Sequence, residues 1–505
     1  MEMVLSFFPM IVTFLLFVVM VLKIVKRFKD SERYLILPPG PWKLPIIGNL
    51  HQLVGSLPHH QLRNLANKYG PLMYLQIGEI PTIVISSAEF AKEVLKTHDI
   101  IFSSRVQTLA GNVITYNSSG MLFTPYGDEW RELRKLTVME VLSVKKVQSF
   151  RSIREQEVSN LISWIASKSG SAINLTEKLF SLSYDITSKA AFGNKCTDRE
   201  IFISIMEEVM RLIVGANVAD LFPSIRFLQP ITGIKSRVQK MHQQADKIIS
   251  SIIDEHKTRK ARLETGKDED IVDVLFSVQE RADLEFPITT DNIKAIITEV
   301  FGAASETAAT TLDWAICEMM KNPRVLKKAQ EEVREVFNKK GKVDETGIAE
   351  MQFLKLVIKE TMRLHTPGPL LFPRECRQSC KINGFDIPAK ATVIVNAWAI
   401  ARDPKYWSEP ESFIPERFFD SSIDFKGLDF EYIPFGSGRR ICPGIPFAIA
   451  NIELILAMLL YHFDWKLPNG MKHEDLEMTE IFGVTVRRKN DLHIIPVPHR
   501  PSPVA

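Results

Sequence analysis

FGSGRRICPG, residues 435–444, is the stretch of this sequence that decides the fold. It places Cys442 in a loop that is rich in glycine and carries two arginines, Arg439 and Arg440. Glycines let backbone N–H groups approach the sulfur, and the arginines raise the local potential, so both features favour a thiolate. Such a thiolate can be the axial ligand of a haem iron. The alternative is an ordinary buried cysteine in a turn before a helix.

The composition limits what kind of protein can carry this loop. The chain has 505 residues, 45% of them hydrophobic, which is ample for a large core, and its formal net charge of +3 does not point to nucleic acid as a partner. The five cysteines are odd in number and scattered, which argues against a disulfide framework. Four of them are therefore interpreted as structural: Cys196, Cys317, Cys376 and Cys380.

The N-terminus predicts a membrane anchor. Residues 4–22 contain no charged side chain, which is just long enough to span a bilayer core, and four basic residues follow between positions 23 and 29. The positive-inside rule then places the rest of the chain in the cytosol. The alternative, a cleaved signal peptide, usually has a basic start, a shorter apolar run and a small-residue cleavage site, none of which is evident. The predicted organisation is an anchor at 1–22, a basic linker at 23–37 and a body at 38–505.

The body begins with a stiff segment and is mainly helical. Residues 38–45 include four prolines, which favour an extended conformation that would hold the body at a fixed attitude to the membrane. Apolar spacing near 3.6 residues predicts helices, and β-branched runs predict a few strands. Residues 257–270 are charged and predict a solvated loop. The expected helices are 155–167, 200–214, 235–255 and 323–336, and the expected strands are 73–77, 82–85, 392–396 and 492–495.

A further helix is expected over residues 291–321, about 46 Å long at its ordinary rise per residue. Its middle, residues 302–311, is rich in small side chains, which would let a flat group approach the backbone. Thr307 can donate back to a carbonyl one turn earlier and open a polar notch, and Glu306 beside it could relay protons. Taken alone, the small residues also fit tight helix packing. The fold class is therefore mainly α with a small β region, in one unit.

Taken together, these motifs resemble the cytochrome P450 family, from residue 38 to the C-terminus. Residues 130–134 fit its Trp-x-x-x-Arg, residues 360–363 its Glu-x-x-Arg and residues 415–418 its Pro-Glu-Arg-Phe. Within the family, the sequence resembles the plant microsomal class, in particular the subfamilies that oxidise sesquiterpenes, diterpenes and some indole alkaloids. The cysteine loop fits the haem-thiolate signature at Phe435, Gly438, Arg440, Cys442 and Gly444.

The resemblance assigns roles to individual residues. It implies haem as the cofactor, with Cys442 as its axial ligand and with Trp130, Arg134, Arg374 and Arg440 meeting the haem propionates. Glu306 and Thr307 correspond to the family's acid–threonine pair, which delivers protons during oxygen activation. Ala304 departs from the family pattern, in which glycine is common, and its methyl group would narrow the site. A buried ion network behind the haem would consist of Glu360, Arg363 and Arg417.

The implied reaction is monooxygenation of an apolar substrate, a terpenoid in the first place, with O2. Electrons would come from a membrane-bound, NADPH-dependent flavoprotein reductase that docks near the cysteine face, at the endoplasmic reticulum membrane. Family-equivalent stretches predict an apolar wall suited to such a substrate. The predicted substrate contacts are Leu109, Val113, Ile114, Phe301, Ala304, Leu370, Leu371, Phe482 and Val484.

Other functions stay open at this point. The substrate could instead be an alkaloid or phenolic scaffold. A haem-thiolate isomerase or dehydratase would need neither reductase nor O2, but such enzymes often lack the acid–threonine pair that Glu306 and Thr307 supply. A non-catalytic haem or lipid carrier would have no use for these motifs.

Overall fold

A computed structural model describes residues 35–499, apart from 194–197, 215–216, 226, 262–268, 282–285, 342 and 484. The predicted anchor at 1–22 and most of the linker at 23–37 lie outside the described residues, as do Cys196 and Val484. The boundaries expected for these segments therefore stay predictions.

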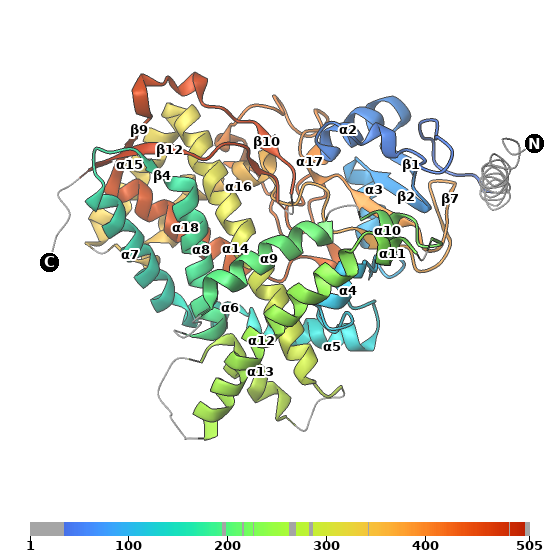
Figure 1. The fold of residues 1–505 in the computed structure, drawn as a ribbon. Helices are drawn as coiled ribbons and strands as arrows, with labels where there is room; N and C mark the ends of the chain where they lie inside the picture. The colour runs from blue at the N-terminus through green and yellow to red at the C-terminus, as the bar shows by residue number, and fades with distance from the viewer. Residues whose placement is uncertain are drawn as a thin grey trace, which may run out of the picture.

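The body is mainly helical, as expected from the sequence. Most of the helices gather on one side, while β1 and β2, with α2 and α3 beside them, lie at the other end (Figure 1). The α-helices are α2 Pro58–Tyr69, α3 Ala88–Lys92, α4 Leu109–Ile114, α5 Asp128–Leu136, α6 Val144–Ser149, α7 Arg151–Ser167, α8 Leu175–Phe192, α9 Arg199–Val214, α10 Val218–Leu221, α11 Leu228–Ile231, α12 Ile234–Ala261, α13 Ile271–Gln279, α14 Thr290–Lys321, α15 Pro323–Lys340, α16 Gln352–Leu364, α17 Ala397–Ile400 and α18 Ile445–His462.

Short strands form small sheets around this helical body. The largest sheet has the order β1-β2-β8-β5-β3, and its β1–β2 pair is the predicted hairpin, with Leu72 opposite Ile85. Smaller sheets pair β6 with β7, β10 with β11, and β12 with β4 and β9. The strands are β1 Leu72–Ile77, β2 Ile80–Ile85, β3 Ser104–Arg105, β4 Ile173–Asn174, β5 Arg374–Glu375, β6 Cys380–Ile382, β7 Phe385–Ile387, β8 Thr392–Val395, β9 Phe463–Lys466, β10 Glu480–Ile481, β11 Arg487–Arg488 and β12 His493–Pro498.

The long helix α14 is the central element of the body, and the structure confirms it. Thr289 caps its N-terminus: the hydroxyl of Thr289 accepts from the Asn292 amide, while the Asn292 side chain accepts from Thr289. The helix packs against α8, α18 and α16, so most of its side chains are buried. Polar groups placed on α14 are therefore held inside the protein.

The other predicted helices are confirmed as α7, α9, α12 and α15, whereas the predicted loop at 257–270 is wrong in part. Helix α12 continues through Lys257 to Ala261, and Asp270 is the buried N-cap of α13. The charged residues here are solvated but helical, because they lie on the exposed surface of α12 and pair with the neighbouring helix α13. Arg259 binds Asp273 at 2.6 Å and Lys260 binds Glu280 at 2.5 Å.

Among the described residues, one helix is long and apolar enough to cross a membrane, namely α18 at Ile445–His462. Half of that apolar stretch is buried inside the protein, and α18 packs against α14, α15 and α7. Its hydrophobicity is therefore accounted for by its place in the core.

Candidate active site

The loop that carries Cys442 has a backbone that only glycine permits at two points. Gly436 and Gly438 have φ values of 72° and 71°, in the left-handed region. A Cβ on Gly438 would also lie 2.1 Å from the carbonyl oxygen of Leu95. The chain then turns back so that the Cys442 amide donates to the carbonyl of Phe435 at 3.0 Å. The spacing of these glycines thus fixes where the sulfur is presented.

The buried residue Asp99 supports the loop that carries Cys442. Its carboxylate accepts from the Arg439 amide at 2.8 Å and from the guanidinium of Arg374 at 3.0 Å. Arg374 is itself buried and donates to the carbonyl of Ser437 at 2.8 Å. Arg374 therefore reaches the loop through Asp99 and Ser437, and its expected contact with a haem propionate stays a prediction. Asp99 stands far from the loop in the sequence and belongs to none of the motifs, so no local pattern indicates this role.

The side chain of Arg440 points into the protein. It binds backbone carbonyls just before β3 and between β3 and α5. It donates to the carbonyls of Ser103 at 2.7 Å and Met121 at 2.8 Å, and it lies over the ring of Trp130, 4.4 Å from the ring centroid. The indole N–H of Trp130 donates to the same Met121 carbonyl at 3.1 Å. Arg134 contacts the sulfur of Met121 at 3.8 Å. The structure thus brings Trp130, Arg134 and Arg440 to one place.

The electrostatics around Cys442 correct one expectation. Burial raises the pKa of the Cys442 thiol, and the Gly444 amide and the charge of Arg134 offset this only in part. Desolvation of the sulfur therefore works against the thiolate that the glycines and arginines of the loop were expected to favour. A coordinated metal ion deprotonates a thiol outright, so the thiolate depends on the metal as well as on the loop.

Glu360, Arg363 and Arg417 form a closed ion network, as the resemblance implies. Arg363 binds Glu360 with two hydrogen bonds, at 2.7 and 2.9 Å, and Arg417 binds the same carboxylate at 2.9 Å. Glu360 and Arg363 are 0% exposed. Their burial next to carbonyls of residues 401–412 makes this network a fixed part of the fold.

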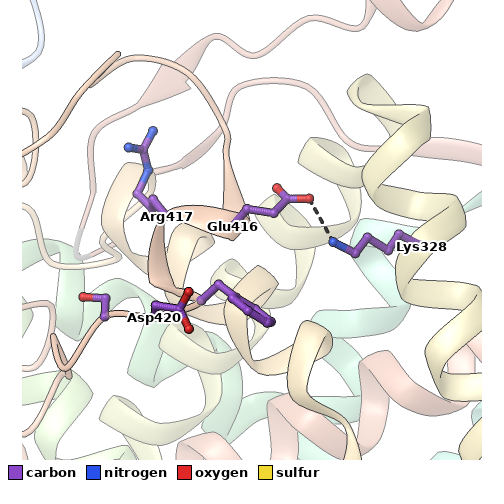
Figure 2. Close-up of a pocket in the computed structure, with 6 residues that line it drawn as sticks. Lys328, Glu416, Arg417 and Asp420 are labelled. Atoms are coloured by element: carbon purple, nitrogen blue, oxygen red, sulfur yellow. Dashed lines mark hydrogen bonds and ion pairs between the residues drawn. The ribbon is translucent and has the colours of Figure 1, made fainter.

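A surface pocket lies on the outer side of this network but does not contain the candidate site. Figure 2 shows Glu416 reaching Lys328 while its neighbour Arg417 points the other way. Glu416 binds Lys328 at 3.1 Å and Arg324 at 2.6 Å, and all three side chains are partly exposed. Two successive residues of the turn Pro415–Phe418 thus belong to different ion pairs. Glu416 belongs to one at the surface and Arg417 to a buried one.

On α14, an accessible face interrupts an otherwise buried helix. Val300, Ala303, Ala304 and Thr307 are accessible, whereas their neighbours Gly302, Ser305 and Glu306 are buried. The accessible positions are spaced i, i+3, i+4 and i+7, so they share one helix face. The hydroxyl of Thr307 donates back to the carbonyl of Ala303 at 2.8 Å, as predicted. Small side chains and one hydroxyl therefore line this face.

Glu306 is adjacent to Thr307 but is held on a different side of the helix. Its carboxylate oxygen Oε1 accepts from Arg487 at 2.7 and 2.9 Å and from the Thr485 hydroxyl at 2.8 Å. Arg487 begins β11 and lies 181 positions away in the sequence, so no local pattern could have indicated this pair. The acid and the threonine are thus neighbours in sequence with different partners in space.

Glu299 is a second buried acid of α14 that the sequence analysis did not single out. The amide of Leu122 donates to both of its oxygens at 3.0 Å. A Cβ on Gly120 would lie 2.3 Å from one of them, so this glycine is required for the close approach. Burial raises the pKa of Glu299 to about 7, although these backbone bonds oppose the rise. Glu299 therefore ties the segment before α5 to α14.

The predicted substrate contacts fall into two groups. Phe301 is 1% exposed and packs with Phe192, Phe202 and Tyr184, and Ile114 is also buried, so both belong to the hydrophobic core. Val484 lies outside the described residues. The others are partly accessible: Leu109, Val113, Ala304, Leu370, Leu371 and Phe482.

Comparison with known proteins identifies what this site belongs to. Residues 38–495 match the family described as Cytochrome P450. The chain is a cytochrome P450. It is 54% identical to tabersonine 16-hydroxylase 1 of Catharanthus roseus over 492 residues, with 96% of each chain covered. It is 51% identical to premnaspirodiene oxygenase of Hyoscyamus muticus over 483 residues, covering 95% of this chain and 96% of that one.

The fold comparison agrees with the sequence comparison. A solved zebrafish cytochrome P450, in a structure with progesterone, superposes with a TM-score of 0.74 at 25% identity. The match covers 88% of this chain and 100% of that chain. The mainly helical architecture with small sheets is therefore the cytochrome P450 fold.

Membership of the family establishes the chemistry in outline. The protein is a monooxygenase with a haem-thiolate iron, and its electrons come from NADPH through a reductase. The residues present fit this cofactor. The chain offers a glycine-framed cysteine, three cationic or aromatic side chains gathered at Met121, and an accessible face of small residues on the central helix. That combination provides a soft axial ligand, cationic and aromatic side chains that could turn to receive carboxylates, and a helix face of small side chains that a flat ring could approach.

Proposed function

We propose that this cytochrome P450 hydroxylates an apolar plant specialised metabolite, most simply a terpenoid, on the accessible face of α14. The support is the accessible, apolar row at Val300, Ala303 and Ala304, which ends at the hydroxyl of Thr307. A relative that is 51% identical over nearly its whole length is named for oxygenation of premnaspirodiene.

In this proposal the loop residues Phe435, Cys442 and Gly444 hold the haem, with the Cys442 sulfur on the iron. Trp130, Arg134, Arg374 and Arg440 supply the polar edge that receives the propionates. Arginine suits this role because its planar fork binds carboxylates bidentately. The bound haem supplies the oxygen-activating chemistry, and the protein supplies ligation, orientation and protons.

Thr307 and Glu306 are proposed to deliver those protons. The Thr307 hydroxyl lies on the accessible face and can pass a proton because it both donates and accepts hydrogen bonds. Glu306 is the nearest carboxylate in sequence and is joined by Arg487 to the protein surface, since the Arg487 side chain is 31% exposed. Arg487 keeps its own proton and does not relay one, so a proton from solvent would pass through water to the Glu306 carboxylate and from there to Thr307.

The substrate is proposed to contact the partly accessible apolar side chains. Leu109 and Val113 come from α4, Ala304 from α14, and Phe482 from the turn after β10. Leu370 and Leu371 precede β5, and Leu371 lies next to Gly436 of the cysteine loop, 3.8 Å from the position of a Cβ there. Phe301 and Ile114 shape this wall from the core behind it, and Val484 completes the proposed set.

The membrane arrangement and the partner are also proposals. Residues 1–22 would anchor the chain in the endoplasmic reticulum membrane by a single span, with the linker at 23–37 and the catalytic body at 38–505 in the cytosol. The reductase would dock on the cysteine face, attracted by exposed basic side chains. Arg131, Lys135 and Arg439 are the candidates there, with 57%, 64% and 44% of their side chains exposed.

A second candidate, hydroxylation of an indole alkaloid, is favoured by one observation. The relative that is named tabersonine 16-hydroxylase 1 is 54% identical to this chain. Identity at this level is similar for both named relatives, so it does not separate the two substrate classes.

Co-expression with a plant reductase in microsomes tests the proposal. Premnaspirodiene and tabersonine are supplied as probes, and mass spectrometry looks for products that have gained one oxygen atom. We expect an oxygenated product that requires both NADPH and the reductase. An oxygenated product that forms without NADPH and reductase would contradict the proposal.

The ligand assignment is tested with Cys442→Ala and a matched control, Cys380→Ala, on β6. We expect Cys442→Ala to lose the thiolate signature in the spectrum of the reduced, carbon monoxide-bound protein and to lose all turnover. Cys380→Ala should keep both. A thiolate signature that survives in Cys442→Ala would exclude Cys442 as the ligand.

A further inference from the structure

The hairpin of β10 and β11, residues 480–488, is attached to the rest of the protein at both ends. Its strands pair antiparallel, with Glu480 opposite Arg488 and Ile481 opposite Arg487. Its turn carries Phe482, one of the proposed substrate contacts. This turn lies between the two attachments described below.

The first attachment is a row of polar groups on one side of α14. Glu306, Thr310 and Trp314 are spaced four residues apart and share a helix face. Glu306 binds Arg487 at 2.7 Å, the hydroxyl of Thr310 lies 3.1 Å from that of Thr485, and Trp314 donates to the carbonyl of Val486 at 2.9 Å. The second half of the hairpin thus lies along α14.

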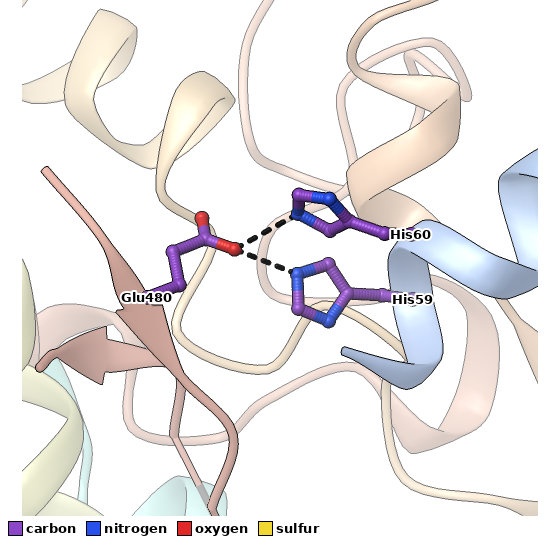
Figure 3. A group of neighbouring side chains, drawn as sticks. All are labelled: His59, His60 and Glu480. Atoms are coloured by element: carbon purple, nitrogen blue, oxygen red, sulfur yellow. Dashed lines mark hydrogen bonds and ion pairs between the residues drawn. The ribbon is translucent and has the colours of Figure 1, made fainter. Parts of the chain in front are cut away.

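The second attachment joins β10 to α2. Figure 3 shows His59 and His60 pointing from α2 to the same carboxylate of Glu480, with Nε2–Oε2 distances of 2.9 and 3.0 Å. Burial raises the pKa of Glu480, but the hydrogen bonds from the histidines outweigh it and hold the pKa well below its usual range. Glu480 is therefore ionised and both Nε2 atoms donate to it.

These three side chains also match a metal-ligand set, but the protonation argues against one. Metal binding through Nε2 would move the His59 proton to Nδ1, and Nδ1 of His59 is buried without a hydrogen-bond partner. Metal-bound histidines usually donate that proton to a partner. The cluster is therefore interpreted as a clamp on the N-terminal end of the hairpin.

We propose that Arg487 is a positioning residue for Glu306 and that the hairpin 480–488 couples the occupant of the substrate side to proton delivery. This inference rests on the proposed function of Glu306 and Thr307. With β10 clamped to α2, a substrate that pushes on Phe482 changes the position of the other strand. Arg487 then holds the Glu306 carboxylate on its own side of the helix or releases it, so that it can turn toward Thr307.

The surroundings of the ion pair between Glu306 and Arg487 allow it to open and close. The side chain of Glu306 is 5% exposed, whereas that of Arg487 is 31% exposed and lies over the ring of Phe180, 4.6 Å from the centroid. Arg487 therefore has an alternative partner in solvent, while Glu306 has none as favourable. Tyr184 of α8 also lies within the field of this pair, because Glu306 raises and Arg487 lowers its pKa, which burial raises most.

The test uses the purified full-length holoenzyme in detergent, with reductase and whichever of premnaspirodiene and tabersonine is turned over. Arg487→Gln should lower the ratio of product to NADPH consumed by about 10-fold to 100-fold, because a displaced reacting group costs that much. The KM for the probe should stay unchanged, and Arg487→Lys should restore most of the ratio. Lys489→Gln, which removes an exposed charge on the same segment, should behave like the parent.

A thermodynamic cycle separates positioning from general damage. Glu306→Gln combined with Arg487→Gln should lower the ratio no further than Glu306→Gln alone, because the two residues act as a unit. Additive losses, or an Arg487→Gln variant indistinguishable from Lys489→Gln, would overturn the inference. A loss that Arg487→Lys does not repair would overturn it as well.

A measurement without turnover tests the inference independently of the proposed function. Hydrogen exchange of the backbone amides at residues 485–487 should accelerate in both Glu306→Gln and Arg487→Gln holoenzymes and stay unchanged in Lys489→Gln. Unchanged exchange in the first two would refute the coupling. If exchange responds as expected but the parent makes no NADPH-dependent product, the proposed function fails and the mechanical link stands.

Discussion

Two ion pairs of glutamate with arginine in this protein differ in how far their side chains are exposed to solvent. In the network of Glu360, Arg363 and Arg417, the side chains of Glu360 and Arg363 are both 0% exposed. In the pair on the central helix, Glu306 is 5% exposed but Arg487 is 31% exposed. The first group is fixed on all sides, whereas the second has one edge in solvent.

The difference follows from what surrounds each arginine. The guanidinium of Arg363 also donates to the carbonyls of Ala401, Pro410 and Ser412, at 2.7–3.0 Å, so no direction is open to change. The contacts of Glu306 come from one hairpin and converge on one oxygen. A closed network contributes to the stability of the fold, while an open pair can serve the reaction. The following predictions would break or sharpen this contrast.

The largest effect is expected for Glu360→Gln. It leaves Arg363 and Arg417 as buried charges without their carboxylate, which costs about 3–5 kcal/mol in similar cases. We expect a lower free energy of unfolding, measured by urea denaturation, and poor haem retention. Glu416→Gln, in the exposed pair of the neighbouring residue, is the control and should cost less than about 1 kcal/mol. Equal losses of unfolding free energy in the two variants would show that the buried network stabilises the fold no more than the exposed pair does.

Glu299 should give a stability that depends on pH because it is a buried acid with no arginine bound to it in the described residues. Its folded pKa, about 7, lies above the ordinary 4.5. The folded state therefore binds the proton of Glu299 more tightly than the unfolded state does. The contribution of Glu299 to the free energy of unfolding is greatest below pH 4.5 and declines as the pH rises to about 7. The decline should amount to about 3 kcal/mol. Glu299→Gln should abolish most of this slope, and a slope that persists would assign it to other groups.

Glu306→Gln should change function more than stability. We expect product formation to fall about 100-fold, in the range that positioned proton transfer contributes. The free energy of unfolding should fall by only about 1–2 kcal/mol, because solvent can still pair with Arg487. Steady-state kinetics and urea denaturation on the same preparation measure both. A stability loss as large as that of Glu360→Gln would erase the contrast between the two groups.

The smallest effect is expected at the clamp between α2 and β10. Burial lowers the pKa of His59 below 6.5, so the stability it gives as a neutral group is lost as the pH falls below about 6.5. Glu480 has a lowered pKa, so its contribution is present above about pH 4.3 and lost below it. Glu480→Gln should cost about 1–2 kcal/mol at pH 7 and flatten the pH profile of unfolding below about pH 4.3, where Glu480 would otherwise take up a proton. An unchanged profile would show that the clamp contributes nothing measurable.

Much of the fold was readable from local patterns. The hairpin β1–β2 and the helix α14 were predicted to within a residue or two, since alternation, periodicity, caps and a following proline are properties of short stretches. The charged stretch after residue 257 misled because charge alone does not distinguish solvated chain from helices that pair their charges. The motif residues Glu360, Arg363 and Arg417 meet in space as the resemblance implies.

The sequence by itself determined the cysteine loop, the acid–threonine pair and the family, because these are written in contiguous residues whose spacing has chemical meaning. The tertiary structure alone decided that Asp99 supports the loop, that Phe301 faces the core and that Arg487 holds Glu306. Such partners are far apart along the chain, and only packing brings them within hydrogen-bonding distance. Desolvation raises the pKa of the Cys442 thiol, so its charge depends on the iron as well as on the residues around it.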